Sequence, residues 1–369
     1  MKESFANERL YNMIDAISQT AYEAARRGAG LIDRSDRGRI VVSGRDRAEY
    51  LQGLLSNDIV ALKPGAGCYA TYLTPQGRMI ADLLVYELGD LILLTMSGDV
   101  TATVLGKLDQ FIFSEDVKLG DVTGTFAQWA VIGPRAATAV AAMVSGIPAD
   151  VLSALEEHGN VRAFFDGRPA IVARVTDTGA PGFDVFVERA QAEALEARLL
   201  NGGAVPIDAA TADTVRIESG VPIFHRDMDE ETIPLEAGIE GRAISLTKGC
   251  YVGQEVIIRV LHRGHGRVAR KLVGLALDGG SAPAAGATVR SGDREIGHVT
   301  SATISPALDR PIALAYLQRD FVQVGTAVTV GDGLTGVVSR LPFVFRSQQK
   351  IKHGRSRERS EGACLRGGR

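Results

Sequence analysis

The sequence is poor in cysteine and has no long apolar segment. Its three cysteines, Cys68, Cys250 and Cys364, are an odd number in a chain of 369 residues, which is typical of free thiols in a reducing, cytoplasmic compartment. No uncharged apolar run approaches the roughly 20 residues that a membrane-crossing helix needs, so we expect no membrane span. The first 27 residues contain four acids and no apolar core, unlike a transit or signal peptide.

The chain also lacks an excess of charge of one sign. Its net formal charge of −3 argues against nucleic acid as a partner. Residues 346–369 carry eight Lys or Arg side chains and two acids, so the rest of the chain is acidic. We expect this basic, aperiodic tail to be disordered. A hydrophobic content of 45% in a chain of this length predicts two or three globular domains.

Short motifs of common enzyme classes are missing. The sequence contains no GxxxxGK[ST], HExxH, GxSxG or CxxC. Residues 264–269 match GxGxxA, but a helical pattern precedes them and β-type runs follow, which is the wrong context for dinucleotide binding. Cys250, His262 and His265 lack the spacing of a zinc module, so we expect no metal site.

Apolar periodicity divides the chain in two. Strand-like and helix-like patterns alternate up to about residue 260, which predicts a mixed α+β region. After Gly266 the pattern changes to short β-type runs with turn residues between them, which predicts a β-barrel or sandwich. The expected strands are 39–43, 80–86, 91–96, 126–132, 161–175 (a hairpin), 183–187, 241–246, 272–277, 287–290, 295–301, 311–317, 327–330 and 334–338. The expected helices are 10–17, 46–55, 100–112, 136–144, 150–157, 190–200 and 251–261.

Cys250 is the best candidate for a reactive thiol. A strand and turn precede it, and a helix is predicted from Tyr251, which would place the thiol at a helix N-terminus beside Lys248. Backbone N–H groups and a nearby cation both favour a thiolate. The alternative is a small cysteine buried in the core.

The octapeptide around this cysteine resembles a known family. Residues 248–255, KGCYVGQE, resemble the signature of the YgfZ family, folate-binding proteins tied to iron–sulfur cluster assembly or repair and relatives of the T-protein of the glycine cleavage system. Further blocks at 30–38, 51–65, 72–86, 216–220 and 227–238 resemble T-protein segments in the same order.

The resemblance implies an α+β fold with three lobes in a ring and a C-terminal β-barrel. The domains are then an N-terminal helical lead (1–29), a two-lobed folate-binding region (30–264), the barrel (265–345) and the basic tail (346–369).

The resemblance also implies site residues around a tetrahydrofolate or a derivative of it. Asp82 lies where the T-protein keeps its catalytic aspartate, and Cys250 is the second catalytic candidate. Asp82 could instead be an ordinary strand acid that faces solvent. Arg216 lies where the family has a folate-contacting arginine, although it could instead form a surface ion pair with Glu218. The other folate-binding candidates are Asn57, Tyr72, Lys248, Tyr251, Gln254 and Glu255.

One departure from the T-protein pattern concerns the pterin. The T-protein has Thr-Gly-Glu-x-Gly-Phe-Glu, whose first glutamate accepts hydrogen bonds from the pterin, whereas residues 178–184 read TGAPGFD. Ala180 cannot accept these bonds, and an unpaired buried donor costs about 1–3 kcal/mol. Either another acid substitutes, or the ligand binds differently or weakly.

Three functional hypotheses follow. The first is a cytoplasmic YgfZ-type protein that binds a reduced folate and supports iron–sulfur enzymes, with client enzymes or assembly proteins as partners. The second is a folate-dependent aminomethyltransferase of the glycine cleavage system, which Asp82 favours and Ala180 opposes. The third is a non-catalytic binding scaffold on the same fold.

Overall fold

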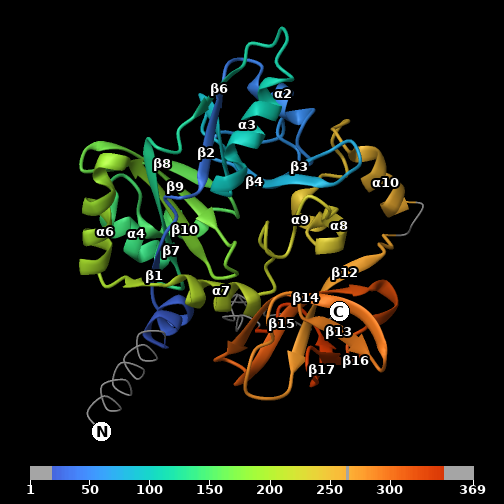
Figure 1. Cartoon of the computed structure of the whole chain (residues 1–369). Coiled ribbons are helices and arrows are strands. Elements are labelled where there is room, and N and C mark those ends of the chain that lie inside the picture. Colours follow the sequence, from blue (N-terminus) through green and yellow to red (C-terminus); the bar gives the residue numbers. More distant parts are fainter. Residues whose placement is uncertain (1–18, 263–265, 345–369) are drawn as a thin grey trace, which may run out of the picture.

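The computed structural model describes residues 19–262 and 266–344. They form two lobes built on β-sheets and a third lobe that is a closed β-barrel (Figure 1). The predicted α+β architecture with a C-terminal barrel is confirmed. No helix in the described part of the chain is both long and apolar enough to cross a membrane.

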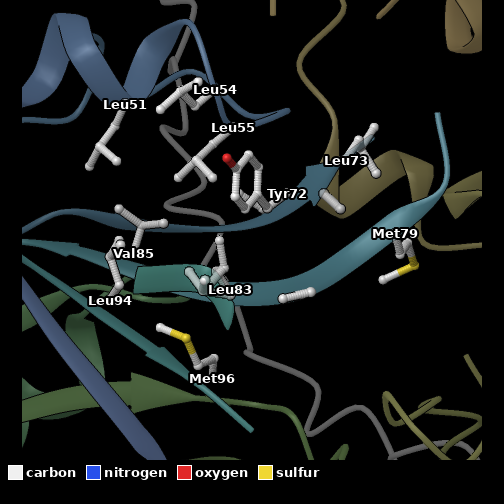
Figure 2. Packing of buried hydrophobic residues seen from close by; sticks show 14 of the residues in the cluster. Leu51, Leu54, Leu55, Tyr72, Leu73, Met79, Leu83, Val85, Leu94 and Met96 are labelled. Atoms are coloured by element: carbon white, nitrogen blue, oxygen red, sulfur yellow. The ribbon is translucent and has the colours of Figure 1, made fainter. Parts of the chain in front are cut away.

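The first lobe is a five-stranded sheet with its apolar core on one face. The strand order is β3-β4-β5-β2-β6. Leu51, Leu55, Tyr72 and Leu83 meet in this core, where α2 and the segment after it cover the sheet (Figure 2). The elements are β2 (Gly38–Ser43), α2 (Arg47–Gln52), β3 (Gly67–Leu73), β4 (Met79–Glu87), β5 (Leu91–Met96), η1 (Gly98–Val100), α3 (Thr101–Asp109) and β6 (Lys118–Asp121).

The second lobe is a six-stranded sheet of order β11-β1-β7-β10-β9-β8. Helices α4 and α6 pack against it and bury Val140, Leu195 and Leu199. The elements are β1 (Gly30–Asp33), β7 (Phe126–Ile132), α4 (Ala136–Met143), α5 (Ala149–Ala154), β8 (Asn160–Phe165), β9 (Arg168–Val175), β10 (Gly182–Glu188), η2 (Arg189–Gln191), α6 (Ala192–Asn201) and β11 (Val205–Pro206).

The third lobe is a six-stranded barrel that closes in the order β12-β15-β14-β13-β16-β17. Inward-facing side chains such as Val273, Leu275 and Leu277 fill it, while Leu272 on the outside packs with Ile217 of the preceding helix α7. The elements are β12 (Arg270–Leu277), β13 (Thr288–Ser291), β14 (Arg294–Ser305), β15 (Arg310–Gln318), η3 (Arg319–Phe321), β16 (Ala327–Val330) and β17 (Leu334–Ser339).

Four helices lie between the lobes. They are α7 (Ala209–Glu218), α8 (Pro234–Ala237), α9 (Glu240–Ala243) and α10 (Gln254–His262). Figure 1 shows α7 beneath the second lobe and α8 and α9 between the first lobe and the barrel. A helical stretch over residues 19–27 precedes β1. The predicted helix over 10–17 and the basic tail over 346–369 lie outside the described residues.

Two predicted elements near the octapeptide are wrong. Residues 241–246 do not form a strand, because α9 occupies Glu240–Ala243 and an irregular segment follows. The last helix before the barrel begins at Gln254 rather than Tyr251. Gly253 adopts a left-handed φ of +83°, and a Cβ there would lie 2.5 Å from the Thr74 carbonyl oxygen, so the chain turns before the helix can start.

Candidate active site

One loop connects the two sheet lobes and places charged side chains between them. Strand β1 belongs to the second lobe and β2 to the first, so residues 34–37 cross from one sheet to the other. Fully buried Arg39 fixes this loop, since its guanidinium donates to the carbonyls of Ser35 (2.9 Å) and Thr123 (2.7 Å). The loop is therefore a rigid support for the side chains of Arg34 and Arg37.

Asp82 projects from β4 on the face opposite the apolar core. Because side chains alternate along a strand, Ala81 and Leu83 enter the core while Asp82 points to the other side. The Tyr69 hydroxyl on neighbouring β3 donates to Asp82 Oδ2 at 2.9 Å. Burial raises the pKa of Asp82, and the hydrogen bond from Tyr69 partly opposes that shift. Asp82 is thus a shielded carboxyl poised to exchange a proton.

The second lobe contributes a buried ion-pair cluster. The Arg34 guanidinium contacts Asp177 Oδ1 and Oδ2 at 2.9 and 2.8 Å and Asp184 Oδ1 at 3.1 Å. Gln128 donates to the other Asp184 oxygen at 2.8 Å. Burial favours the neutral form of Asp177, but the charges of Arg34 and Arg37 outweigh it and lower the pKa of that carboxyl. Burial dominates at Asp184 and raises its pKa.

Arg34, Asp82 and Asp177 line a cavity of about 360 Å³ between the two sheets. Its walls combine apolar side chains with five arginines and four aspartates, which come from the two sheet lobes and from the helices and loops that lead to the barrel. A pocket of this size with a few convergent polar groups is typical of a small-molecule site. The lining residues include Ile32, Arg34, Asp36, Arg37, Tyr69, Asp82, Leu84, Asp177, Thr178, Ala209, Ala212, Asp213, Arg216, Ile223, Phe224, Arg226, Ile239 and Arg242.

Arg216 reaches this cavity from α7, but most of its hydrogen-bonding capacity is already used. Its Nε donates to Asp213 at 2.7 Å, and one terminal nitrogen donates to Asp227 and to the Val221 carbonyl. The other terminal nitrogen donates to Ser301 of the barrel at 2.6 Å. Four of the five N–H groups of the guanidinium are engaged within the protein. The alternative of a surface pair with Glu218 is wrong, because both side chains are buried and Glu218 pairs with Arg26.

Asp82 and Arg216 are the two predicted site residues that the structure brings to this cavity. Tyr72 lies in the apolar core of the first lobe and is 2% exposed (Figure 2). Asn57 donates to the carbonyls of Tyr69 and Arg242 at 2.8 and 3.0 Å, so it fastens α9 to β3. Neither Tyr72 nor Asn57 lines the cavity.

The octapeptide lies outside the cavity. Cys250 is a free, exposed thiol in the loop before Gly253, and it is neither at a helix N-terminus nor buried in the core. Tyr251 is 7% exposed and packs in the core of the first lobe, while Gln254 and Glu255 begin α10.

Lys248 turns away from solvent. Its Nζ donates to the carbonyls of Gln52, Leu55 and Asn57 at 2.7, 2.5 and 2.8 Å and lies 5.0 Å from the centre of the Tyr251 ring. Burial lowers the pKa of Lys248 to about 8. This side chain holds the segment after α2 and does not line the cavity.

Ala180 also lies away from the cavity. It is 4% exposed and packs with Ala25, Ile132 and Val215. The acid that faces the cavity from the same loop is Asp177, three residues earlier.

Sequence reasoning missed most polar residues of the cavity, among them Arg34, Arg37, Tyr69 and Asp177. Arg34 and Arg37 lie within residues 30–38, which carry part of the family resemblance, and Asp177 directly precedes residues 178–184. The family resemblance of these two segments was the sequence signal that could have identified the three residues. Within residues 19–262 and 266–344, no three His, Cys, Asp or Glu side chains gather so that they could hold a metal ion.

Comparison with known families agrees with this architecture. Residues 3–248 match the model of the GCVT N-terminal domain, and residues 270–344 match that of the glycine cleavage T-protein C-terminal barrel domain. The chain therefore belongs to the glycine cleavage T-protein family.

Individual relatives point the same way. An aminomethyltransferase of Rubrobacter xylanophilus is 36% identical over 91% of this chain and 88% of its own length, and one of Nostoc is 31% identical over 89% and 88%. The solved glycine cleavage system aminomethyltransferase T from Bartonella henselae is 25% identical, covers 89% of both chains and superposes with a TM-score of 0.80.

These similarities correct the first functional hypothesis. The octapeptide favours a YgfZ-type role with iron–sulfur partners, but many curated relatives that match about nine-tenths of the chain are named aminomethyltransferases, and so is the structural neighbour. Our preference for the YgfZ-type function was therefore wrong, because a short segment outside the cavity outweighed the rest of the chain.

Proposed function

We propose that this chain is an aminomethyltransferase that passes a one-carbon unit from an aminomethyl group on a lipoyl carrier to a reduced folate held in the central cavity. The observation that carries the proposal is Asp82, a half-buried carboxyl that faces the cavity and accepts a hydrogen bond from Tyr69 at 2.9 Å. The names of the relatives support the same chemistry.

The residues of the cavity fit a reduced folate. Apolar side chains such as Ile32, Ile223 and Ile239 offer walls for a flat heterocycle, and Asp177 offers an acceptor for ring N–H groups. The buried Arg37 Nε has no hydrogen-bond partner among the described residues, so the cavity also holds a donor that awaits an acceptor. Tetrahydrofolate, when bound, supplies the N5 amine that receives the methylene group.

Asp82 handles the proton in this proposal. A shielded carboxyl whose pKa is raised by burial is a better proton acceptor than a solvated one, and it can later release the proton near the reacting amine. Tyr69 restricts the orientation of the carboxylate by donating to Oδ2, so that Oδ1, the other oxygen, can face the ligand. The arrangement allows Asp82 to position the amine and to accept the proton that the transfer releases.

The test is folate-dependent release of ammonia from an aminomethyl-lipoyl carrier protein. We expect the wild-type protein to release ammonia, and Asp82→Asn to lower kcat/KM by about 100-fold to 10,000-fold, the range typical of a general acid or base. The Kd for tetrahydrofolate should change by no more than a few fold. Asp293→Asn, an exposed aspartate of the barrel, is the matched control and should behave as wild type. Asp82→Asn with wild-type kcat/KM would contradict the proposal.

A further inference from the structure

Arg37 differs from the other arginines of the cavity. Arg34 pairs with Asp177, Arg216 with Asp227, and the remaining two, Arg226 and Arg242, pair with Asp213 and Glu157. Arg37 forms no side-chain hydrogen bond or ion pair with any described residue. Among residues 19–262 and 266–344 it is therefore the one cavity guanidinium without a protein partner for any of its N–H groups.

The position of Arg37 indicates that its unpaired N–H groups bind a ligand. Its loop is fixed between the two sheets by Arg39, and its Nε is shielded from solvent. A shielded donor without a partner costs free energy, and a guanidinium can only donate. A ligand that fills this cavity relieves the cost if it presents an oxygen acceptor to Arg37.

The neighbouring charges restrict which acceptor fits. Asp82 and Asp177 line the same cavity, and Arg37 is close enough for its charge to act on both carboxyls. A ligand carboxylate at Arg37 would lie beside these two acids and be repelled by them. A neutral ring carbonyl avoids that repulsion, and ring N–H groups next to it can donate to the aspartates.

We propose that Arg37 determines the ligand specificity of the cavity by donating to a ring carbonyl, which in a folate is the 4-oxo group of the pterin. This inference rests on the proposed function, because it assumes that a folate occupies the cavity. It follows that the cavity selects a 4-oxo pterin over the 4-amino form, because an amino group offers Arg37 a donor instead of an acceptor.

The experiment is a calorimetric titration under anaerobic conditions with two probes, tetrahydrofolate and tetrahydroaminopterin, which differ in the C4 substituent and in the N3 proton that the 4-oxo form carries. The wild-type protein should bind tetrahydrofolate about 10-fold to 100-fold more tightly than the 4-amino analogue, the ratio expected for one unpaired buried donor. Binding is measured directly, so the result does not depend on turnover.

Two variants and a control assign the preference to Arg37. Arg37→Met should weaken binding of tetrahydrofolate and lower the ratio of the two Kd values well below that of the wild-type protein; any preference that remains comes from ring N–H groups that donate to the aspartates. Arg37→Lys keeps a cationic donor and should retain a preference for the 4-oxo probe. Arg290→Met removes an exposed arginine of the barrel and should leave both Kd values unchanged. Urea unfolding of each variant verifies that it is folded.

The outcomes separate this inference from the proposed function. Wild-type binding of tetrahydrofolate without discrimination, or a preference that is undiminished in Arg37→Met, overturns the role of Arg37 and leaves the proposed function standing. Binding of neither probe by the wild-type protein overturns both. If Arg37→Met does not fold, a Kd ratio near one in folded Arg37→Lys equally overturns the role of Arg37.

Discussion

Replacing Arg216 with methionine tests whether this arginine joins the lobes or holds the ligand. The guanidinium connects α7 to Asp227 in the following loop and to Ser301 in the barrel, and it is 2% exposed. Asp227 is 1% exposed, so Arg216→Met leaves a buried carboxylate without its cation. Breaking a buried pair in this way costs about 3–5 kcal/mol. We expect a loss of that size in the free energy of unfolding.

The assay is urea unfolding followed by fluorescence of Trp129, the single tryptophan, which is buried in the second lobe, and by circular dichroism. The midpoint for Arg216→Met should fall while the slope stays unchanged. Arg290→Met, at an exposed position, should match wild type. A folded Arg216→Met with a wild-type midpoint and no affinity for tetrahydrofolate would refute this reasoning and make Arg216 a ligand contact.

Two further predictions concern residues outside the cavity wall. His225 Nδ1 lies 2.6 Å from Asp99 and Nε2 lies 3.2 Å from Glu230; burial favours neutral imidazole, but these carboxylates outweigh it and raise the pKa of His225. The stabilisation is then present below the ordinary pKa of histidine and is lost as pH rises through the raised pKa of His225. We therefore expect His225→Gln to lower the urea midpoint at about pH 6 but not at about pH 9. An equal decrease at both pH values would contradict this prediction. Cys250→Ser should keep ammonia release within about twofold of wild type, since the exposed thiol lies outside the cavity, and a loss of activity in a folded variant would show otherwise.

Sequence periodicity predicted the elements whose burial follows a regular pattern. Strand β7 (Phe126–Ile132) matches its predicted range, and β8 and β9 form the predicted hairpin over 161–175, with its turn at Asp166 and Gly167. The barrel strands were also found, because turn residues separate short apolar runs at regular spacing. These elements each bury one continuous apolar face, which is what periodicity measures.

Helix α7 was missed because its buried face is polar. Arg216 and Glu218 are both buried there, so the helix has no simple apolar stripe. Its start was nevertheless readable, since Asp208 caps the helix by accepting from the Thr211 N–H at 2.7 Å. Tertiary pairing of charges, which no local pattern records, stabilises this helix.

The candidate site was only partly predictable for a similar reason. Asp82 was found through the family resemblance, and strand alternation left its direction open until the neighbouring elements were placed. Arg37 and Asp177 come from loops of different lobes, and their proximity depends on the crossing of the chain between β1 and β2. Cys250 stood out because of its motif, but the turn at Gly253 keeps it away from the cavity.

The most direct test of the account is to fill the cavity from a position that tolerates a large side chain. Ala209 on α7 lines the cavity, whereas Ala210, the next residue on the same exposed turn, does not. In a calorimetric titration with tetrahydrofolate, wild type and Ala210→Trp should bind saturably in the micromolar range, about −8 kcal/mol, and Ala209→Trp should not bind. Equal binding by all three proteins, or no binding by wild type, would contradict the claim that this cavity holds the folate.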